Sequence, residues 1–98
     1  MKENGQLKDQ LTKKPSWIHK RNWVEDGSQV AITTPPGRMY WLNESGGFIW
    51  KMCDGEHTIG DLTDAMVERY ENLDRNTAIK DLIELILSWE RLGLVTLR

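Results

Sequence analysis

The side chains of this 98-residue chain that could do covalent or acid–base chemistry are few and scattered. Cys53 is its single cysteine, and His19 and His57 are its two histidines. Cys53 follows an apolar helical segment, and we interpret it as a core thiol because no base is assigned to it. His19 lies in an expected strand and His57 in a turn before a helix, where polar side chains are common. The sequence therefore predicts no catalytic site.

Acidic residues occur in pairs at helical spacing, Asp61 with Asp64 and Asp81 with Glu84. Such pairs are usually neighbours on a solvated helix surface. A lone cysteine offers no CxxC metal motif, and Gly46-Gly47 is only a pair at a helix start rather than a phosphate-binding loop. We expect no metal ion and no cofactor.

The composition is that of one small soluble domain, with 39% apolar and 29% charged residues and five tryptophans. The net charge of -2 argues against a dedicated nucleic-acid binder, which usually has a strongly basic surface. The chain has neither the apolar run of a signal peptide nor one long enough to span a membrane. Its unpaired cysteine fits a reducing compartment. These features predict a cytoplasmic protein.

The first 14 residues are polar, rich in lysine and without periodicity. Such a segment predicts a flexible tail, and Pro15 ends it. The expected organisation is a tail over residues 1–14 and a single domain over residues 15–98.

Strand signals dominate the start of this domain. Trp17-Ile18 and Trp23-Val24 precede a hairpin turn at residues 25–28, and a second strand follows at residues 29–34. After a Pro-Pro-Gly turn, residues 38–42 form the last strand of an antiparallel meander, where we expect it to be an edge.

Capping residues then mark two helices. Asn43 is a good N-cap for the first helix, and Asp54-Gly55 ends it, since glycine tolerates the left-handed conformation found at helix ends. Thr58, with Asp61 three residues later, indicates a capping box for the second helix.

A third, longer helix is predicted over residues 75–92, with Asn72 or Asp74 as its cap and Gly93 as its stop. Residues 94–97 alternate in polarity and predict a closing strand or an extended tail. The fold class is α+β: a winged helix-turn-helix with a three-stranded antiparallel sheet followed by three helices.

The third helix is apolar over a wide arc. One stripe is assigned to the core: Ala78, Leu82, Leu85, Ile86 and Trp89. A second stripe lies about 100° around the helix, at Ile79, Ile83 and Leu87. Two interpretations stay open: the second stripe faces the sheet while the first faces the two smaller helices, or the second stripe borders a groove. In a groove, an extended peptide could add to the edge strand through main-chain hydrogen bonds.

Four segments together resemble one known family: LNESGGFIW, CDGEHT, IGDLTDAMVERY and DLIELILSWERLGLV. That family is the PqqD family, and the resemblance covers residues 38–95, with a looser match back to Pro15. It implies a winged helix-turn-helix module called a RiPP recognition element, which binds the leader segment of ribosomally made precursor peptides.

The resemblance also implies where the leader binds, as an added strand in the cleft beside the third helix. Carried over by matching position, the edge strand is Arg38, Met39, Tyr40, Trp41 and Leu42, and the helix wall is Ile79, Lys80, Ile83, Ile86 and Leu87. The implied partners are a precursor peptide and a separate modifying enzyme, such as a radical SAM enzyme or a leader peptidase, with no nucleic acid and no membrane.

Two other functions remain open. A winged helix-turn-helix often binds DNA, so a transcription regulator is the main alternative. However, Asp81, Glu84 and Glu90 on the third helix are poorly suited to reading a DNA groove. A non-catalytic structural subunit of an enzyme complex is the other alternative, because it too would expose apolar surface for a partner.

Overall fold

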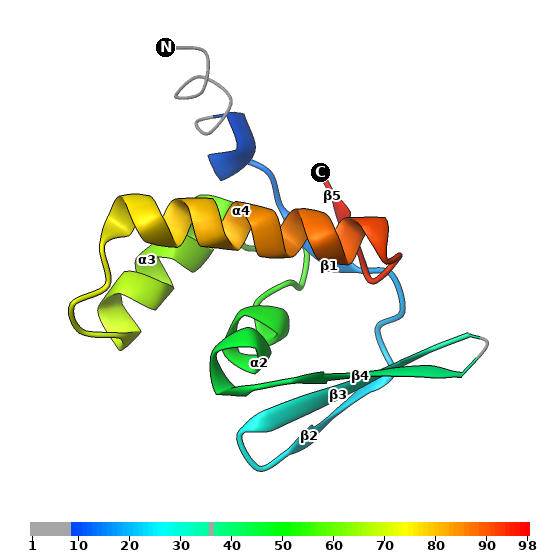
Figure 1. The fold of residues 1–98 in the computed structure, drawn as a ribbon. Coiled ribbons are helices and arrows are strands. Elements are labelled where there is room, and N and C mark those ends of the chain that lie inside the picture. The colour runs from blue at the N-terminus through cyan, green and yellow to red at the C-terminus, as the bar shows by residue number, and fades with distance from the viewer. Residues whose placement is uncertain (1–8, 36) are drawn as a thin grey trace.

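The computed structural model describes residues 9–35 and 37–98, so the expectations for residues 1–8 and for Pro36 lie outside the described residues. The elements follow one another along the chain as β1 (Pro15–Trp17), β2 (Trp23–Asp26), β3 (Gln29–Thr34), β4 (Arg38–Leu42), α2 (Glu44–Lys51), α3 (Ile59–Arg69), α4 (Arg75–Arg91) and β5 (Val95–Leu97). The long helix α4 crosses the molecule, with the three-stranded sheet on one side and the C-terminal end of the chain on the other (Figure 1).

The main sheet is the expected antiparallel meander in the order β2-β3-β4. Its register pairs Trp23 with Ile32 and Ile32 with Tyr40. The first turn is tighter than expected, because Glu25 and Asp26 belong to β2 and Gly27 turns the chain at a φ of 64°. No strand of the described chain pairs with the free side of β4, so β4 is an edge.

A second, two-stranded sheet joins the beginning of the chain to its end. β1 pairs antiparallel with β5, with Trp17 opposite Val95. Trp17 was expected in the first strand of the meander, and this prediction was wrong because its partner strand lies almost 80 residues later. Gly55 fixes β1 from the other side, since its N–H donates to Pro15 O at 2.9 Å and its φ of 81° suits a glycine.

The expected tail over residues 1–14 is too long at its C-terminal end. Residues 9–11 are helical, and Leu11 packs against the core. Lys13 O accepts a hydrogen bond from Ile59 N at 2.9 Å, and Lys14 exchanges two backbone hydrogen bonds with Arg98. The domain therefore includes residues from 9 onward. The sequence signal failed because Leu11 is the single apolar residue of the polar segment 9–14 and the other contacts use the backbone, which carries no residue-type pattern.

The helices begin where their capping residues predict, but α2 ends at Lys51 with Met52 as its C-cap, before the expected stop at Asp54-Gly55. Asn43 accepts a hydrogen bond from Gly46 N, and Thr58 and Asp61 form a complete capping box. Asp74, rather than Asn72, caps α4, and its side chain accepts from Thr77 N at 3.0 Å. Gly93, at a φ of 76°, follows the C-terminus of α4.

Tryptophans form much of the core between the main sheet and the helices. Trp50 of α2 is buried, and its ring lies edge-on to Trp89 of α4 at a centroid distance of 5.3 Å. Trp17 Nε1 donates to Trp50 O at 2.8 Å, and Trp23 packs against both of these rings. Aromatic rings of this size compensate for the small core of a short chain.

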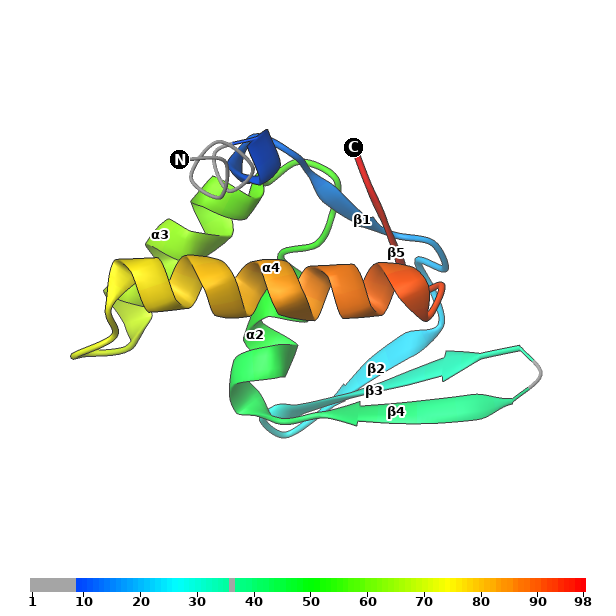
Figure 2. The same cartoon turned by 45° about the horizontal axis from the view of Figure 1, so that its top comes forward.

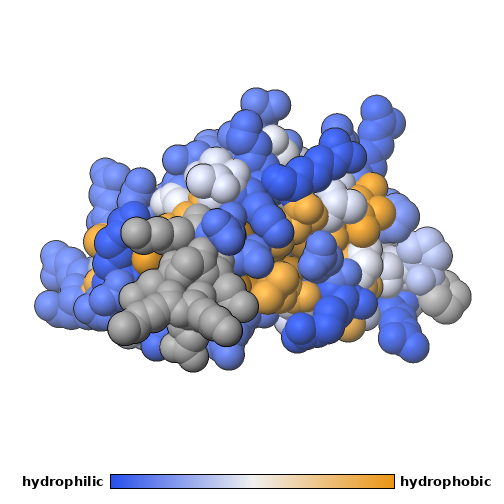
Figure 3. All heavy atoms as spheres, turned by 90° about the horizontal axis from the view of Figure 1, so that it is seen from above, coloured by the Kyte–Doolittle hydropathy of each residue, from blue (hydrophilic) through white to orange (hydrophobic). Residues whose placement is uncertain are grey.

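Helix α2 lies between the main sheet and α4, and α3 packs on the N-terminal part of α4 (Figure 2). Seen from the side of the chain ends, the surface is mostly hydrophilic, and hydrophobic atoms show between charged side chains (Figure 3). Within residues 9–35 and 37–98, no helix is both long and apolar enough to cross a membrane.

Candidate functional site

The free edge of β4 presents main-chain groups of two residues, Met39 and Trp41. Thr33 N donates to Asn22 O at 2.8 Å, so the polar groups of Thr33 point toward the β2 side of β3. Because backbone groups alternate in direction along a strand, those of Ile32 point toward β4 and pair with Tyr40. The N–H and C=O groups of Met39 and Trp41 therefore point outward, to where a further strand would pair.

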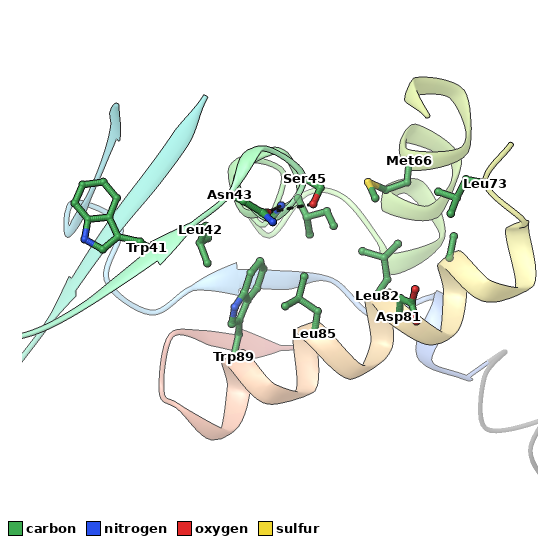
Figure 4. Close-up of a pocket in the computed structure, with 13 residues that line it drawn as sticks. Trp41, Leu42, Asn43, Ser45, Met66, Leu73, Asp81, Leu82, Leu85 and Trp89 are labelled. Carbon is green, nitrogen blue, oxygen red and sulfur yellow. Dashed lines mark hydrogen bonds between the residues drawn. The ribbon is translucent and has the colours of Figure 1, made fainter. Parts of the chain in front are cut away.

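Side chains of β4 alternate between two faces of the sheet. Tyr40 and Leu42 pack against the core and face the helices. Met39 and Trp41 lie on the opposite face, with 57% and 56% of their surface exposed. Figure 4 shows the Trp41 ring pointing away from α4, while Leu42 points toward it. A strand added to β4 would meet the helices only through the side chains on its inner face.

A cavity of about 500 Å³ lies between the end of β4 and helix α4. Its walls come from the β4–α2 junction, from α3 with the loop after it, and from one stripe of α4 (Figure 4). The lining is mainly apolar and comprises Trp41, Leu42, Asn43, Ser45, Gly46, Ile49, Met66, Leu73, Ala78, Asp81, Leu82, Leu85 and Trp89. A cavity with this chemistry suits apolar side chains more than a charged ligand.

Both apolar stripes of α4 are largely buried, and the stripe assigned to the core is also the one that borders the cavity. Ala78, Leu82, Leu85 and Trp89, assigned to the core, border the cavity, although all but Leu85 are themselves buried. Ile79 and Ile83, expected at a groove, are only 9% and 8% exposed and belong to the core cluster.

The expected helix wall is corrected accordingly. Ile86 is fully buried, Leu87 packs against the core, and Lys80 is exposed on the helix surface. None of Ile79, Lys80, Ile83, Ile86 and Leu87 borders the cavity. The physical reason is that Ile79 and Ile83 are taken up by the core cluster, in a helix that packs on both α3 and β5.

A smaller cavity of about 340 Å³ continues along the same two elements toward the start of β4 and the end of α4. Arg38 and Tyr40 of β4 line it opposite Leu92 and Gly93, and His19 adds a further polar side chain. Thr34 and Pro35 complete the lining. Of the expected edge residues, Trp41 and Leu42 border the large cavity and Arg38 and Tyr40 the small one, whereas Met39 borders neither.

Sequence reasoning missed several residues of the large cavity, among them Asn43, Ser45, Met66, Leu73 and Asp81. Asn43 was identified as a cap, and its side chain also accepts a hydrogen bond from Ser45 Oγ at 3.2 Å. Met66 lies on the apolar face of the second helix, so its spacing indicated burial but not its position beside a cavity. The stripe of Ala78, Leu82, Leu85 and Trp89 was recognised from its spacing, but its position beside a cavity was not.

Cys53 and His57, two of the groups considered for chemistry, do not border the large cavity. Burial, aided by the nearby charge of Asp54, raises the pKa of the Cys53 thiol far above its ordinary value. The Cys53 thiol donates to Ile49 O at 3.3 Å.

Asp54 and His57 form a pair in the turn after α2, with His57 Nδ1 3.0 Å from Asp54 Oδ1. Partial burial opposes ionisation of Asp54, but hydrogen bonds from the Glu56 N–H and from His57 outweigh it and lower the pKa of Asp54. No group of three or more potential ligand side chains in the described ranges could hold a metal ion.

Comparison with known proteins yields one family and two individual matches. The family model described as coenzyme PQQ synthesis protein D (PqqD) matches residues 24–95. A protein from Methylococcus capsulatus named PqqA binding protein is 27% identical over 66 residues, which are 67% of this chain and 70% of that protein.

A solved structure, TbiB1 in complex with the TbiA(β) leader peptide, matches with a TM-score of 0.69 at 20% sequence identity. The match covers 74% of this chain and 85% of that chain. This likeness establishes the fold, and it agrees with the predicted α+β class.

Proposed function

This chain belongs to the PqqD family, and on that premise we propose that it is a peptide-binding adaptor of RiPP biosynthesis. It binds the leader segment of a ribosomally synthesised precursor peptide by strand addition to β4. It then delivers the precursor to a separate modifying enzyme, such as a radical SAM enzyme or a leader peptidase. Two similarities support this proposal: the Methylococcus relative is named PqqA binding protein, and the similar TbiB1 structure is a complex with a leader peptide.

The observation that carries the proposal is the position of the unpaired edge of β4 beside the apolar cavity. A strand at this edge can form hydrogen bonds with Met39 and Trp41, and every second side chain of that strand points toward α4. Main-chain hydrogen bonds supply affinity without regard to sequence, and the cavity selects apolar side chains. The peptide-binding residues that we propose on β4 are therefore Arg38, Met39, Tyr40, Trp41 and Leu42. On α4 they are the residues of the stripe that borders the cavity: Ala78, Leu82, Leu85 and Trp89.

The surface of α4 favours a peptide over DNA. Among its exposed charged side chains, α4 carries as many acidic as basic groups: Asp81, Glu84 and Glu90 against Arg75, Lys80 and Arg91. Phosphate contacts dominate DNA affinity and require arginine or lysine side chains, so a helix surface without excess positive charge offers a DNA backbone little attraction. An adaptor also needs no chemistry of its own, in keeping with a buried Cys53 whose raised pKa disfavours the thiolate.

The proposal is tested with a display library of random 12-residue peptides selected on the immobilised protein. A selected peptide is then added to isotope-labelled protein, and amide hydrogen exchange is measured before and after. Amides of Met39 and Trp41 should become protected, because they acquire hydrogen-bond partners. Amides of Tyr40 and Leu42 should change little, because they already pair with β3.

Met39→Pro is the matching variant, because it removes one outward N–H at a position where an edge strand tolerates proline. It should leave the fold intact and weaken binding of the selected peptide by at least about tenfold, the equivalent of roughly 1.4 kcal/mol. Met39→Ala, which keeps the N–H, is the control and should bind almost normally.

Protection elsewhere, with normal binding by Met39→Pro, would refute strand addition at β4. Tight, sequence-specific binding of DNA at physiological salt would instead favour the transcription regulator.

A further inference from the structure

The two ends of the cleft between β4 and α4 carry opposite charges. Asp81 is the only ionisable residue among those bordering the large cavity, and it lies past the Leu42 end of β4, beyond Trp89 and Leu85 along α4 (Figure 4). Arg38 is the charged residue of the small cavity, at the other end of the cleft, where His19 and Leu92 also line it. The helical span from Asp81 to Leu92 corresponds to about 17 Å at 1.5 Å per residue.

Neither charge is neutralised within residues 9–35 and 37–98. Asp81 and Arg38 form no salt bridge with any residue there, although four other pairs are formed. Glu44, at the Leu42 end, is already occupied, since its Oε1 accepts from Arg69 Nη2 at 3.5 Å and from the Tyr70 hydroxyl at 3.4 Å. Asp81 and Arg38 are therefore available to a ligand lying in the cleft.

We propose that the peptide segment recognised by this protein is itself dipolar. It carries a basic side chain at the end beside Asp81 and an acidic side chain at the end beside Arg38, with apolar residues between them. This inference rests on the proposed function. The cavity selects peptides with apolar side chains, and the charge rule, the requirement for one basic and one acidic side chain, narrows that selection. About four to six residues separate the two charges, because an added strand advances at the same rise per residue as β4.

The charge rule fixes the direction of binding as well as composition. If the added strand runs antiparallel to β4, as in the rest of the sheet, its N-terminal part lies at the Leu42 end. The basic residue then precedes the apolar run and the acidic residue follows it. A peptide with the same composition in reversed order would place like charges together at both ends, which is unfavourable.

The test uses the random 12-residue library as its probe, selected in parallel on the unaltered protein and on the double variant Asp81→Lys with Arg38→Glu. Peptides enriched on the unaltered protein should carry a basic and an acidic residue four to six positions apart in one fixed order. The double variant should enrich the reverse order. For one selected peptide, replacing both charges by glutamine should weaken binding about three- to tenfold at low salt, and the difference should shrink in 0.5 M salt.

Glu84→Lys combined with Arg21→Glu is the matched control, because both residues are exposed and neither borders a cavity. It makes the same exchange of charges and should leave the enriched order unchanged. Thermal unfolding of all proteins checks that the exposed substitutions preserve the fold.

This inference would be overturned if the enriched peptides show no fixed order of basic and acidic residues, or if the double variant at Asp81 and Arg38 enriches the same order as the unaltered protein. Either result would still be compatible with the proposed peptide adaptor. Failure to enrich any peptide would overturn both.

Discussion

Alanine substitutions at Ile83 and at Leu85 should damage different properties of the protein, because the two residues lie on different stripes of α4. Each substitution removes three carbon atoms, and the two residues lie two positions apart on the same helix. Ile83 is 8% exposed and packs in the core cluster, whereas Leu85 is half-buried at the cavity. We expect Ile83→Ala to damage stability and Leu85→Ala to damage peptide binding.

The magnitudes follow from burial. Loss of three buried carbons at about 0.8 kcal/mol each, with a further contribution from the cavity that remains, gives roughly 2.5–4 kcal/mol for Ile83→Ala. That is a large share of the 5–15 kcal/mol typical of a small domain, and it lowers the Tm by roughly 10–25 °C. Leu85→Ala should cost about 1 kcal/mol of stability and weaken peptide binding about 5- to 30-fold.

Urea unfolding followed by tryptophan fluorescence measures the first effect, because Trp50 and Trp89 lie in the same core. Titration with a library-selected peptide measures the second effect, at a temperature where both variants are folded. If Ile83→Ala is as stable as the unaltered protein but no longer binds the peptide, the stripe bearing Ile83 faces the groove and our assignment of the two stripes is wrong.

Three further predictions concern residues outside the groove. The Cys53 thiol, buried and with a raised pKa, should react with a thiol reagent at pH 8 only slowly in the native protein and promptly in urea; equal rates would contradict its burial. Folding lowers the pKa of Asp54, so the charge of Asp54 should stabilise the protein fully above pH about 4, and this contribution should be lost as the pH falls through the folded pKa. The urea midpoints of Asp54→Asn and of the unaltered protein should therefore differ at pH 7 and converge near pH 2. Thr58→Ala removes half of the capping box of α3 and should cost about 1 kcal/mol in the same assay, whereas Thr58→Ser should be nearly neutral.

Local signals in the sequence predicted the helices and turns well. Asn43, Thr58 with Asp61, and Gly93 act through neighbours within four residues, so their roles are visible without a fold. The edge position of β4 also followed from the order of the strands, because a meander places its last strand outside.

Features that depend on distant partners could not be read in this way. The pairing of Trp17 with Val95 joins segments far apart in sequence, and nothing in three-residue strands specifies their partner. The stripes at Ile83 and Leu85 are both apolar, so periodicity alone could not decide which one faces β4. That choice is made by the packing of α4 in the core, which a pattern along one helix does not contain.

The pairing of β1 with β5 has a consequence for how this domain could be tethered to another protein. The backbones of Lys14 and Arg98 are hydrogen-bonded to each other in both directions, at 3.3 and 3.1 Å. Figure 1 shows this meeting point on the opposite side of α4 from the three-stranded sheet. A linker attached at Arg98 would therefore start on the side of α4 away from the three-stranded sheet and would leave the β4 edge unobstructed.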